Sequence, residues 1–304
     1  MGDRVLCRNP FMPSHGSHAA YPCGQCMPCR VNKRRLWMSR MMLESYMHED
    51  NCFVTLTYSP EKLPPGGTLV PKDTQDWLKR LRFDLGEKKI RYYLVGEYGD
   101  ESERPHYHAA IFGIGPDRAD LINSTWGKGF TYVGDLTPHS AQYVAGYVTK
   151  KLTDKDDPRL KGRCPEFARM SRRPGIGATA LGAIRDAVRT PSGLAAIEST
   201  GDVPFIIQVG DKSYPIGRYL RSRLRKMINL GTEQFDGEIT YGAPVSVRLA
   251  QAEEMRALFD AWYATTSPFE KPSQTFKQYL VNLGLGGSIS IEARVNSQSQ
   301  RRKL

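Results

Sequence analysis

Long hydrophobic runs are missing from this sequence. No stretch approaches the roughly 18 consecutive apolar residues that a membrane-spanning helix needs. The first residues, MGDRVLCRNPFMPSHG, contain no apolar core of a signal peptide, and MGDRVL lacks the Ser or Thr of a myristoylation signal. We therefore expect a soluble, cytosolic protein without a membrane partner.

A phosphate-binding P-loop and an excess of acidic residues are also missing. G-x-x-x-x-G-K-[S/T] occurs nowhere, which excludes a recognisable P-loop motor. Asp and Glu number 32 against 43 Lys and Arg, which gives a net charge of +11 and a pI near 9.4. This balance is typical of a chain that contacts a polyanion, so nucleic acid is the leading partner class.

Cysteine is scarce and unevenly distributed. Three of the six cysteines lie in CGQCMPC as Cys23, Cys26 and Cys29, and Cys7 lies upstream. In a reducing cytosol such a cluster indicates metal binding or catalysis before disulfides. The four thiolates would complete a tetrahedral structural Zn²⁺ site, in which a histidine of SHGSH could replace one cysteine. The alternative is a set of ordinary reduced cysteines, because the second pair of a usual zinc finger is missing.

The order of helical and strand segments predicts an α+β domain over residues 30–153, with an antiparallel sheet flanked by helices. Capped helical stretches are interspersed with β-branched and aromatic runs. We expect helices over residues 30–50, 73–86 with Asp73 as cap, 116–126 and from Thr137 onward, and strands over 52–58, 90–99, 106–113 and 129–135. A short loop joins the second and third strands, which favours an antiparallel hairpin.

Two regions flank this predicted domain. Residues 1–29 would form a Cys-rich N-terminal arm, and residues 154–304 a mostly helical C-terminal region with a DNA-binding role as one option. In the latter we expect a linker in TDKDDPRLKGR, helices in GATALGAIRDAVR, GRYLRSRLRKMINL and SVRLAQAEEMRALFDAWY, a hairpin in FIIQVGDKSYPIG and a frayed basic tail in SQSQRRKL.

The strand at 106–113 begins with two histidines one residue apart. Successive side chains of a strand point to opposite faces, so His106 and His108 share one face. The hairpin would bring Glu97 beside them. A His, His, Glu set suits Mn²⁺ or Mg²⁺, with Zn²⁺ also an option, and such a metal would polarise a phosphoryl oxygen. The alternative is a pair of strand histidines that bind nothing.

The segment AQYVAGYVTKKL places candidate nucleophiles on a helix. Tyr143 and Tyr147 are four residues apart and Lys150 follows three later, so all three project from one helical face. Tyrosine is a weak nucleophile at its free pKa of roughly 10 until a metal or base lowers it. Lys150 or Lys151 could hold the developing charge. A tyrosine pair alone indicates helix packing more often than catalysis; the joint pattern with the histidines is harder to obtain by chance.

Basic and aromatic side chains are candidates for DNA contact. The basic residues lie at helical spacing, namely Arg30, Lys33, Arg34 and Arg35 in the first helix and Arg218, Arg221, Arg225 and Lys226 in RYLRSRLRKM. The aromatic residues available to stack on bases are Tyr92, Tyr93, Tyr107 and Trp126. For both basic sets the alternative is an ordinary solvated helix surface.

The motifs FVTLTY, RPHYHAAIFG and QYVAGYVTKK match, in order, the three motifs of the HUH endonucleases, the rolling-circle replication initiators. The chain most resembles initiators of small icosahedral single-stranded DNA phages, the microviruses, and among them the gokushovirus branch. CGQCMPCR, GEYGDESERPHYH and PEFARMSRRPGIG are similar to stretches of those initiators. Together the motifs span roughly residues 20 to 180.

This resemblance implies a metal-dependent enzyme that nicks and joins single-stranded DNA at the phage origin, and so initiates and terminates rolling-circle replication. His106 and His108 would match the paired metal-binding histidines of the family. Tyr143 and Tyr147 would match two tyrosines that alternate, one of which forms a 5′-phosphotyrosine and frees a 3′-hydroxyl. Glu97 as third ligand rests on the strand pairing as much as on the resemblance.

The resemblance also assigns Lys150 or Lys151 to the lysine that follows the two tyrosines. It implies origin DNA and the host replication machinery as partners, and the host bacterial cytoplasm as the compartment. A host helicase is also implied, because the chain has no recognisable motor. One alternative is a non-catalytic, zinc-stapled DNA-binding regulator. Another is a different HUH enzyme, a plasmid relaxase or transposase, although the paired tyrosines and the length favour the phage initiators.

Overall fold

The computed structural model describes residues 7–12, 20–99, 102–146, 156–233, 239–265 and 272–301, and the chain divides into two compact units. The sheet unit comprises Arg34–Ala187 and Phe205–Arg221. The arm unit comprises Met1–Lys33, Val188–Pro204 and Ser222–Leu304. Within the described residues, no helix combines the length and apolar character that crossing a bilayer requires.

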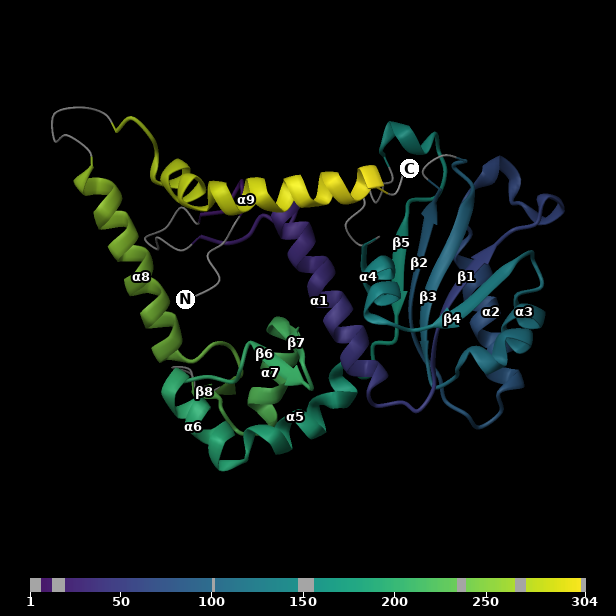
Figure 1. Ribbon diagram of the computed structural model, residues 1–304, viewed down its shortest axis with the longest axis horizontal. Helices are drawn as coiled ribbons and strands as arrows, with labels where there is room; N and C mark the ends of the chain where they lie inside the picture. The colour runs from purple at the N-terminus through teal and green to yellow at the C-terminus, as the bar shows by residue number, and fades with distance from the viewer. Residues whose placement is uncertain are drawn as a thin grey trace. The chain divides into compact units, whose positions relative to one another are not determined.

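A five-stranded antiparallel sheet forms the centre of the sheet unit (Figure 1). Its strands, in the spatial order β4-β1-β3-β2-β5, are β1 (Asn51–Thr57), β2 (Arg91–Tyr98), β3 (Pro105–Phe112), β4 (Thr131–Asp135) and β5 (Phe167–Met170). The predicted hairpin is confirmed, since β2 pairs with β3 and Glu97 lies opposite His106. The α+β class with an antiparallel sheet is confirmed as well. Only β5, which pairs with β2 from beyond residue 153, was not predicted.

One face of the sheet forms the main hydrophobic core. Along β1 every second residue is buried, as expected for a strand with one face in the core. The helices α2 (Pro71–Asp84) and α3 (Ala119–Trp126) cover this face, and they lie together on one side of the sheet in Figure 1. The buried side chains that meet there include Cys52, Val54, Leu56, Trp77, Leu81, Leu94, Tyr107, Ala109, Ile111, Ile122 and Trp126.

Three of the aromatic residues predicted to stack on bases are buried, so that prediction is wrong for them. Tyr93, Tyr107 and Trp126 are at most 1% exposed. The Tyr107 hydroxyl accepts a hydrogen bond from the Val70 N–H at 2.8 Å, and the Trp126 indole N–H donates to the Thr57 carbonyl at 2.9 Å. The polar atoms of Tyr107 and Trp126 therefore serve the fold.

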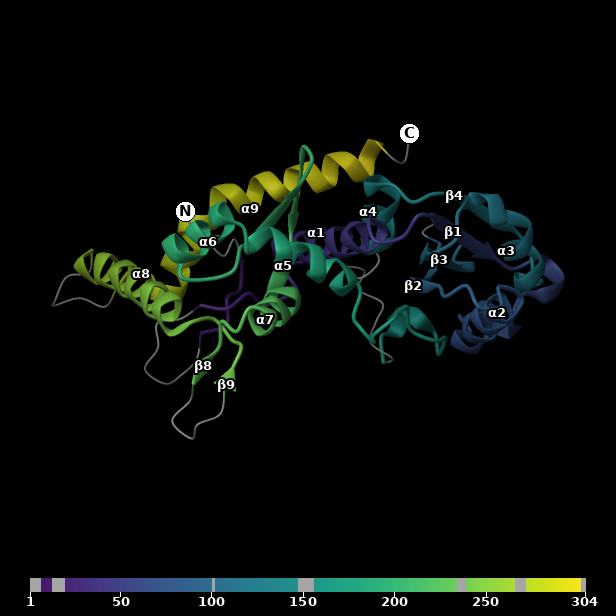
Figure 2. The ribbon, with the colours of Figure 1, turned by 90° about the horizontal axis from the view of Figure 1, so that it is seen from below.

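Two helices cover the opposite face of the sheet. The part of α1 (Met27–Ser45) from Arg34 onward lies there, with the Trp37 and Tyr93 ring centroids 5.0 Å apart. The helix α4 (Pro138–Gly146) packs on β3 (Figure 2). Its predicted cap is confirmed, because Thr137 Oγ1 accepts a hydrogen bond from the Ser140 N–H at 3.2 Å. Asp73 is not the cap of α2, which begins at Pro71 and leaves Asp73 inside the first turn.

The remaining elements lie mostly after residue 155. The predicted hairpin is confirmed as β6 (Ile206–Val209) and β7 (Lys212–Pro215), and three predicted helices as α5 (Leu181–Val188), α7 (Gly217–Met227) and α8 (Val245–Ala264). Elements that were not predicted are α6 (Pro191–Thr200), α9 (Phe276–Arg301) and the pair β8 (Thr232–Glu233) and β9 (Ile239–Thr240). The expected frayed tail is wrong as far as Arg301, because α9 (Phe276–Arg301) continues to that residue. Short 3-10 turns cover Pro60–Lys62, Pro65–Gly67, Pro116–Arg118, Pro158–Leu160 and Ala178–Ala180.

Candidate active site

The β2–β3 hairpin brings three potential metal ligands together. Oε1 of Glu97 lies 3.0 Å from Nε2 of His106 and 3.0 Å from Nε2 of His108. The ligand atoms of the three residues all lie within 4.8 Å of one another. Glu97 and His108 are buried, whereas His106 is partly exposed. One carboxylate and two imidazoles thus converge on a point that solvent can approach past His106.

Hydrogen bonds hold the outer nitrogen of each imidazole. His106 Nδ1 lies 3.0 Å from the Arg104 carbonyl oxygen, which can only accept, so Nδ1 is the donor. His108 Nδ1 lies 2.9 Å from Thr55 Oγ1. A neutral imidazole with its proton on Nδ1 presents a lone pair at Nε2, the atom that faces Glu97. Contacts of this kind orient histidine ligands in metal sites.

Thr55 and Phe53 are site residues that the sequence analysis missed. Both lie on β1, where Thr55 is directly opposite His108. The Phe53 ring stacks on the His108 ring, with centroids 5.8 Å apart and planes at 9°. The signal was present in FVTLTY, because alternation places these two residues on the histidine face and leaves Val54 on the core face.

The helix α4 places Tyr143 beside the histidines. The ring centroids of Tyr143 and His108 are 5.1 Å apart, and their planes meet at 86°. Tyr143 also meets the Phe53 ring edge-on at 6.1 Å, and its side chain is partly exposed. The other residues predicted to act with Tyr143, namely Tyr147 and either Lys150 or Lys151, lie outside the described residues.

The predicted basic residues of α1 have different surroundings. In the sheet unit Arg34 lies next to α4, because a Cβ atom added at Gly146 would be 3.7 Å from Arg34 Cδ. Arg35 is exposed. In the arm unit Arg30 is partly exposed and Lys33 exposed. Arg34 is therefore a positive charge close to the helix that carries Tyr143.

The basic residues of α7 fall into two groups. Arg218 and Lys226 are exposed, but Arg221 and Arg225 are buried. Arg225 donates from Nε and Nη2 to the two carboxylate oxygens of Asp202, both at 2.7 Å. The Arg221 guanidinium lies 3.5 Å from the centre of the Phe205 ring. These contacts argue against a role for Arg221 and Arg225 in binding phosphates.

Two exposed aromatic residues lie on the edge of the sheet near the histidines. Phe130 is 69% exposed and Tyr132 is 62% exposed. Tyr132 lies opposite Thr55, which lies opposite His108, so these three side chains share one face. Neither aromatic was predicted from the sequence as a site residue, although the alternation in GFTYVGD separates them from the partly buried Thr131 and Val133.

The region of the chain that contains this site is similar to known proteins. Residues 51–152 match the family model described as replication-associated protein ORF2/G2P. The chain is 36% identical over 160 residues to replication-associated protein VP4 of Bdellovibrio phage phiMH2K, a match that covers 45% of this chain and 50% of the relative. It is 37% identical over 179 residues to replication-associated protein ORF2 of Spiroplasma virus 4, covering 51% and 55%.

A third relative is replication-associated protein ORF4 of Chlamydia phage 1, which is 30% identical over 155 residues that cover 43% of this chain and 38% of the relative. The chain thus spans about half the length of the first two relatives. No solved structure matches. The resemblance to phage replication proteins that the motifs predicted is confirmed for this part of the chain.

Proposed function

We propose that this chain, which is similar to phage replication-associated proteins, nicks and rejoins single-stranded DNA at a phage replication origin through a tyrosine–DNA intermediate. In this way it would initiate and terminate rolling-circle replication. The observation that carries the proposal is the contact between Tyr143, a potential nucleophile, and His108, a member of the Glu97, His106 and His108 set.

The donor set fits a divalent cation. Glu97 supplies a carboxylate oxygen, and His106 and His108 supply imidazole nitrogens whose orientation the Arg104 carbonyl and Thr55 fix. Three protein ligands leave coordination positions open, and Mn²⁺ or Mg²⁺ accepts oxygen donors there. When bound, the cation would polarise a phosphoryl oxygen of the DNA.

Tyr143 would then attack the phosphorus atom. A bond forms between its phenolic oxygen and phosphorus while the bond from phosphorus to the 3′-oxygen breaks. The tyrosine loses its proton and the departing 3′-oxygen gains one, which leaves a 5′-phosphotyrosine and a free 3′-hydroxyl. One ester replaces another, so cutting needs no nucleotide. This agrees with the absence of a P-loop motif from the sequence.

The other predicted residues of this helix complete the proposal. Tyr147 would cut the regenerated origin after one round, and transfer to the waiting 3′-hydroxyl would rejoin the strand. Lys150 or Lys151 would balance the developing negative charge. Arg34 adds a positive charge next to α4.

Phe130 and Tyr132 fit the role of a base-stacking surface for the DNA strand. Both are exposed beside the histidine face, and stacking of a base on an aromatic ring contributes about 1–3 kcal/mol. A host helicase would unwind the duplex, since the chain contains no recognisable motor. The host bacterial cytoplasm is the compartment that such partners require.

A covalent-adduct assay tests the proposal. The protein is incubated with labelled single-stranded DNA from its own genome and Mn²⁺ or Mg²⁺, and the products are separated on a denaturing gel. We expect a metal-dependent adduct that EDTA prevents. It should persist when either Tyr143 or Tyr147 alone is changed to Phe and disappear in the double variant. Tyr263→Phe, which changes an exposed tyrosine of α8, should leave the adduct unchanged.

Two outcomes would contradict the proposal. Unchanged adduct in the double variant would remove both tyrosines as nucleophiles. Tight binding without an adduct on any genomic segment would favour the second candidate, a non-catalytic DNA-binding regulator. The net charge of +11 and the cysteine cluster support that candidate.

A further inference from the structure

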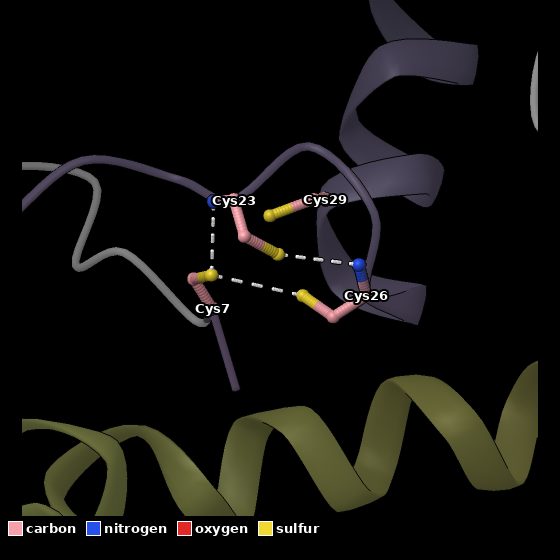
Figure 3. A group of neighbouring side chains, drawn as sticks. All are labelled: Cys7, Cys23, Cys26 and Cys29. Carbon is pink, nitrogen blue, oxygen red and sulfur yellow. Dashed lines mark hydrogen bonds between the residues drawn. The ribbon is translucent and has the colours of Figure 1, made fainter. Parts of the chain in front are cut away.

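Four cysteine side chains of the arm unit converge at the start of α1, as Figure 3 shows. The Sγ atoms of Cys7, Cys23, Cys26 and Cys29 all lie within 4.8 Å of one another. Cys7 and Cys29 are 3% and 8% exposed, and the other two are partly exposed. None of the four forms a disulfide. The proposed DNA-cutting reaction makes no use of this cluster.

The spacing of the sulfur atoms fits a single ion at their centre. The Sγ atoms of Cys7 and Cys26 are 3.8 Å apart. A disulfide would require about 2.0 Å. Four thiolates around one Zn²⁺, each at about 2.3 Å, lie at the corners of a tetrahedron whose edges are about 3.8 Å. The cluster therefore has the dimensions of a zinc–tetrathiolate centre.

The backbone around Cys23 has the form of a metal-binding turn. The N–H groups of Gln25 and Cys26 point at Cys23 Sγ, at 3.4 and 3.3 Å. The Cys23 N–H points at Cys7 Sγ at 3.2 Å. Gly24 permits the turn with φ of +73°, a conformation that other residues rarely adopt. Amide groups aimed at sulfur stabilise the thiolate form, which is the form that binds metal.

The four ligands come from two segments that other contacts also bring together. Cys26 immediately precedes α1 and Cys29 lies in its first turn. Cys7 comes from the arm, where Phe11 and Tyr21 exchange backbone hydrogen bonds of 2.9 and 2.8 Å. This bridge folds the arm back, so that Cys7 reaches the CGQC turn.

Contacts next to Cys7 attach the arm to α9. Arg8 Nε donates to Ser288 Oγ at 3.1 Å, and Lys277 donates to Asn9 Oδ1 at 2.6 Å. An ion held by the four cysteines would therefore fix the first turn of α1 to a segment that already contacts α9. An ion would add to the backbone bridge and the polar contacts that hold the described residues of this arm.

We propose that Cys7, Cys23, Cys26 and Cys29 bind one structural Zn²⁺ that fixes the start of α1 to the arm. Four protein ligands leave no open position for water or substrate, so the ion has a structural role. Thiolates prefer Zn²⁺, whereas Mn²⁺ and Mg²⁺ prefer oxygen donors, so this site and the Glu97, His106 and His108 set take chemically different metals. Arg30 and Lys33 follow on the helix whose first turn the ion fixes.

The test begins with the metal content of the wild-type, full-length protein, purified without chelator. We expect one zinc per chain, released when a mercurial reagent titrates the thiols. Replacement by Co²⁺ should give the strong visible bands of tetrahedral cobalt together with thiolate-to-cobalt charge transfer. Excess Mn²⁺ or Mg²⁺ should change neither the zinc content nor the spectrum. Absence of zinc, or an octahedral cobalt spectrum, would overturn the proposal.

Variants locate the site. Cys7→Ser and Cys26→Ser should each lower the zinc content and the charge-transfer intensity. Cys164→Ser is the matched control, because Cys164 is a free, partly exposed cysteine of the sheet unit. It should retain one zinc per chain. If a cluster variant fails to fold, the wild-type cobalt spectrum and the number of thiols protected by zinc decide the question. Equal thiol reactivity with and without zinc would contradict the assignment.

The zinc measurement is independent of DNA cutting. The Tyr143→Phe/Tyr147→Phe variant should keep its zinc and its cobalt spectrum while losing the covalent adduct. If that variant still cuts DNA, the proposed reaction is wrong and the zinc site is unaffected. If wild-type protein purified without chelator contains no zinc and yet cuts DNA, the zinc proposal is wrong and the reaction is unaffected.

Discussion

Tyr143 meets His108 edge-on, with ring centroids 5.1 Å apart and ring planes at 86°. The first residue lies on α4 and the second on β3, and Phe53 of β1 contacts both rings. Three elements therefore fix the position of the proposed nucleophile relative to the histidines. A shift of α4 by one helical turn relative to the sheet would break all of these aromatic contacts. The contacts therefore fix the position of α4 on the sheet.

The first prediction concerns the two histidines. His106→Ala should abolish nicking and leave most of the DNA affinity, because phosphate contacts elsewhere dominate binding. His108→Ala should also abolish nicking but cost more stability, since His108 is only 4% exposed and contacts Phe53 and Thr55. Adduct assays, salt-dependent DNA binding and chemical denaturation measure the three effects. Joint loss of binding and folding in His106→Ala would mean that this histidine supports the fold.

The second prediction tests the outer contact of His108. Thr55→Val keeps the side-chain shape but removes the hydroxyl that lies 2.9 Å from His108 Nδ1. Loss of such a contact typically lowers metal affinity about 10–100-fold. Thr57→Val is a matched control on the same strand face, since the Thr57 hydroxyl donates to the Phe130 carbonyl. A Mn²⁺ titration of nicking should shift for Thr55→Val only. Equal shifts in both variants would contradict a specific role for Thr55.

The third prediction concerns the exposed aromatic pair. Phe130→Ala and Tyr132→Ala should each weaken single-stranded DNA binding by about 1–3 kcal/mol, because each removes a ring on which a base can stack. Phe83→Ala is the control, since Phe83 is 86% exposed on α2, which covers the other face of the sheet. Fluorescence anisotropy with short oligonucleotides measures the affinities. If Phe83→Ala weakens binding as much as Tyr132→Ala does, the strand does not follow β4.

The register of the hairpin could be predicted, because the alternation of core residues along the strands determines it. A slip of one residue would move Tyr107, Ala109 and Ile111 out of the core, so only one pairing keeps the apolar residues buried. That pairing places Glu97 opposite His106, as expected from the sequence. The Thr137 cap could also be predicted, because it depends only on residues that are close to it in the sequence.

Burial of the large aromatics could not be predicted in the same way. Tyr93 and Tyr107 lie in strands that are covered on both faces. The sequence of a strand alone does not show whether another element packs on its second face. Trp126 is at a helix end that packs on the sheet. The role of Arg225 depends on Asp202, which lies 23 residues earlier and has no recognisable relation to it in the sequence. Strand β5 has four residues, too few for a periodic signal.

The last prediction concerns Glu44, a buried carboxylate of α1 that links three segments of the sheet unit. It forms an ion pair with Arg91 of β2 and accepts a hydrogen bond from the Gly177 N–H at 2.6 Å. Burial alone would raise the pKa of Glu44, but the contacts with His48, Gly177 and Arg91 outweigh it and lower the pKa below its ordinary value. The ionised form therefore stabilises the folded chain.

The sign of the pH effect follows from that direction. The folded pKa lies below the unfolded value of about 4.3, so the stabilisation is present above the unfolded value and is lost as the pH falls through the folded pKa. Glu44→Gln should lower the free energy of unfolding at neutral pH by about 3 kcal/mol or more, because it leaves the Arg91 guanidinium without its carboxylate. Chemical denaturation at several pH values should show the difference from wild type shrinking below about pH 4. Glu87→Gln, at an exposed position after α2, should follow wild type throughout. A Glu44→Gln difference that stays constant with pH would show that packing, and not charge, is what Glu44 contributes.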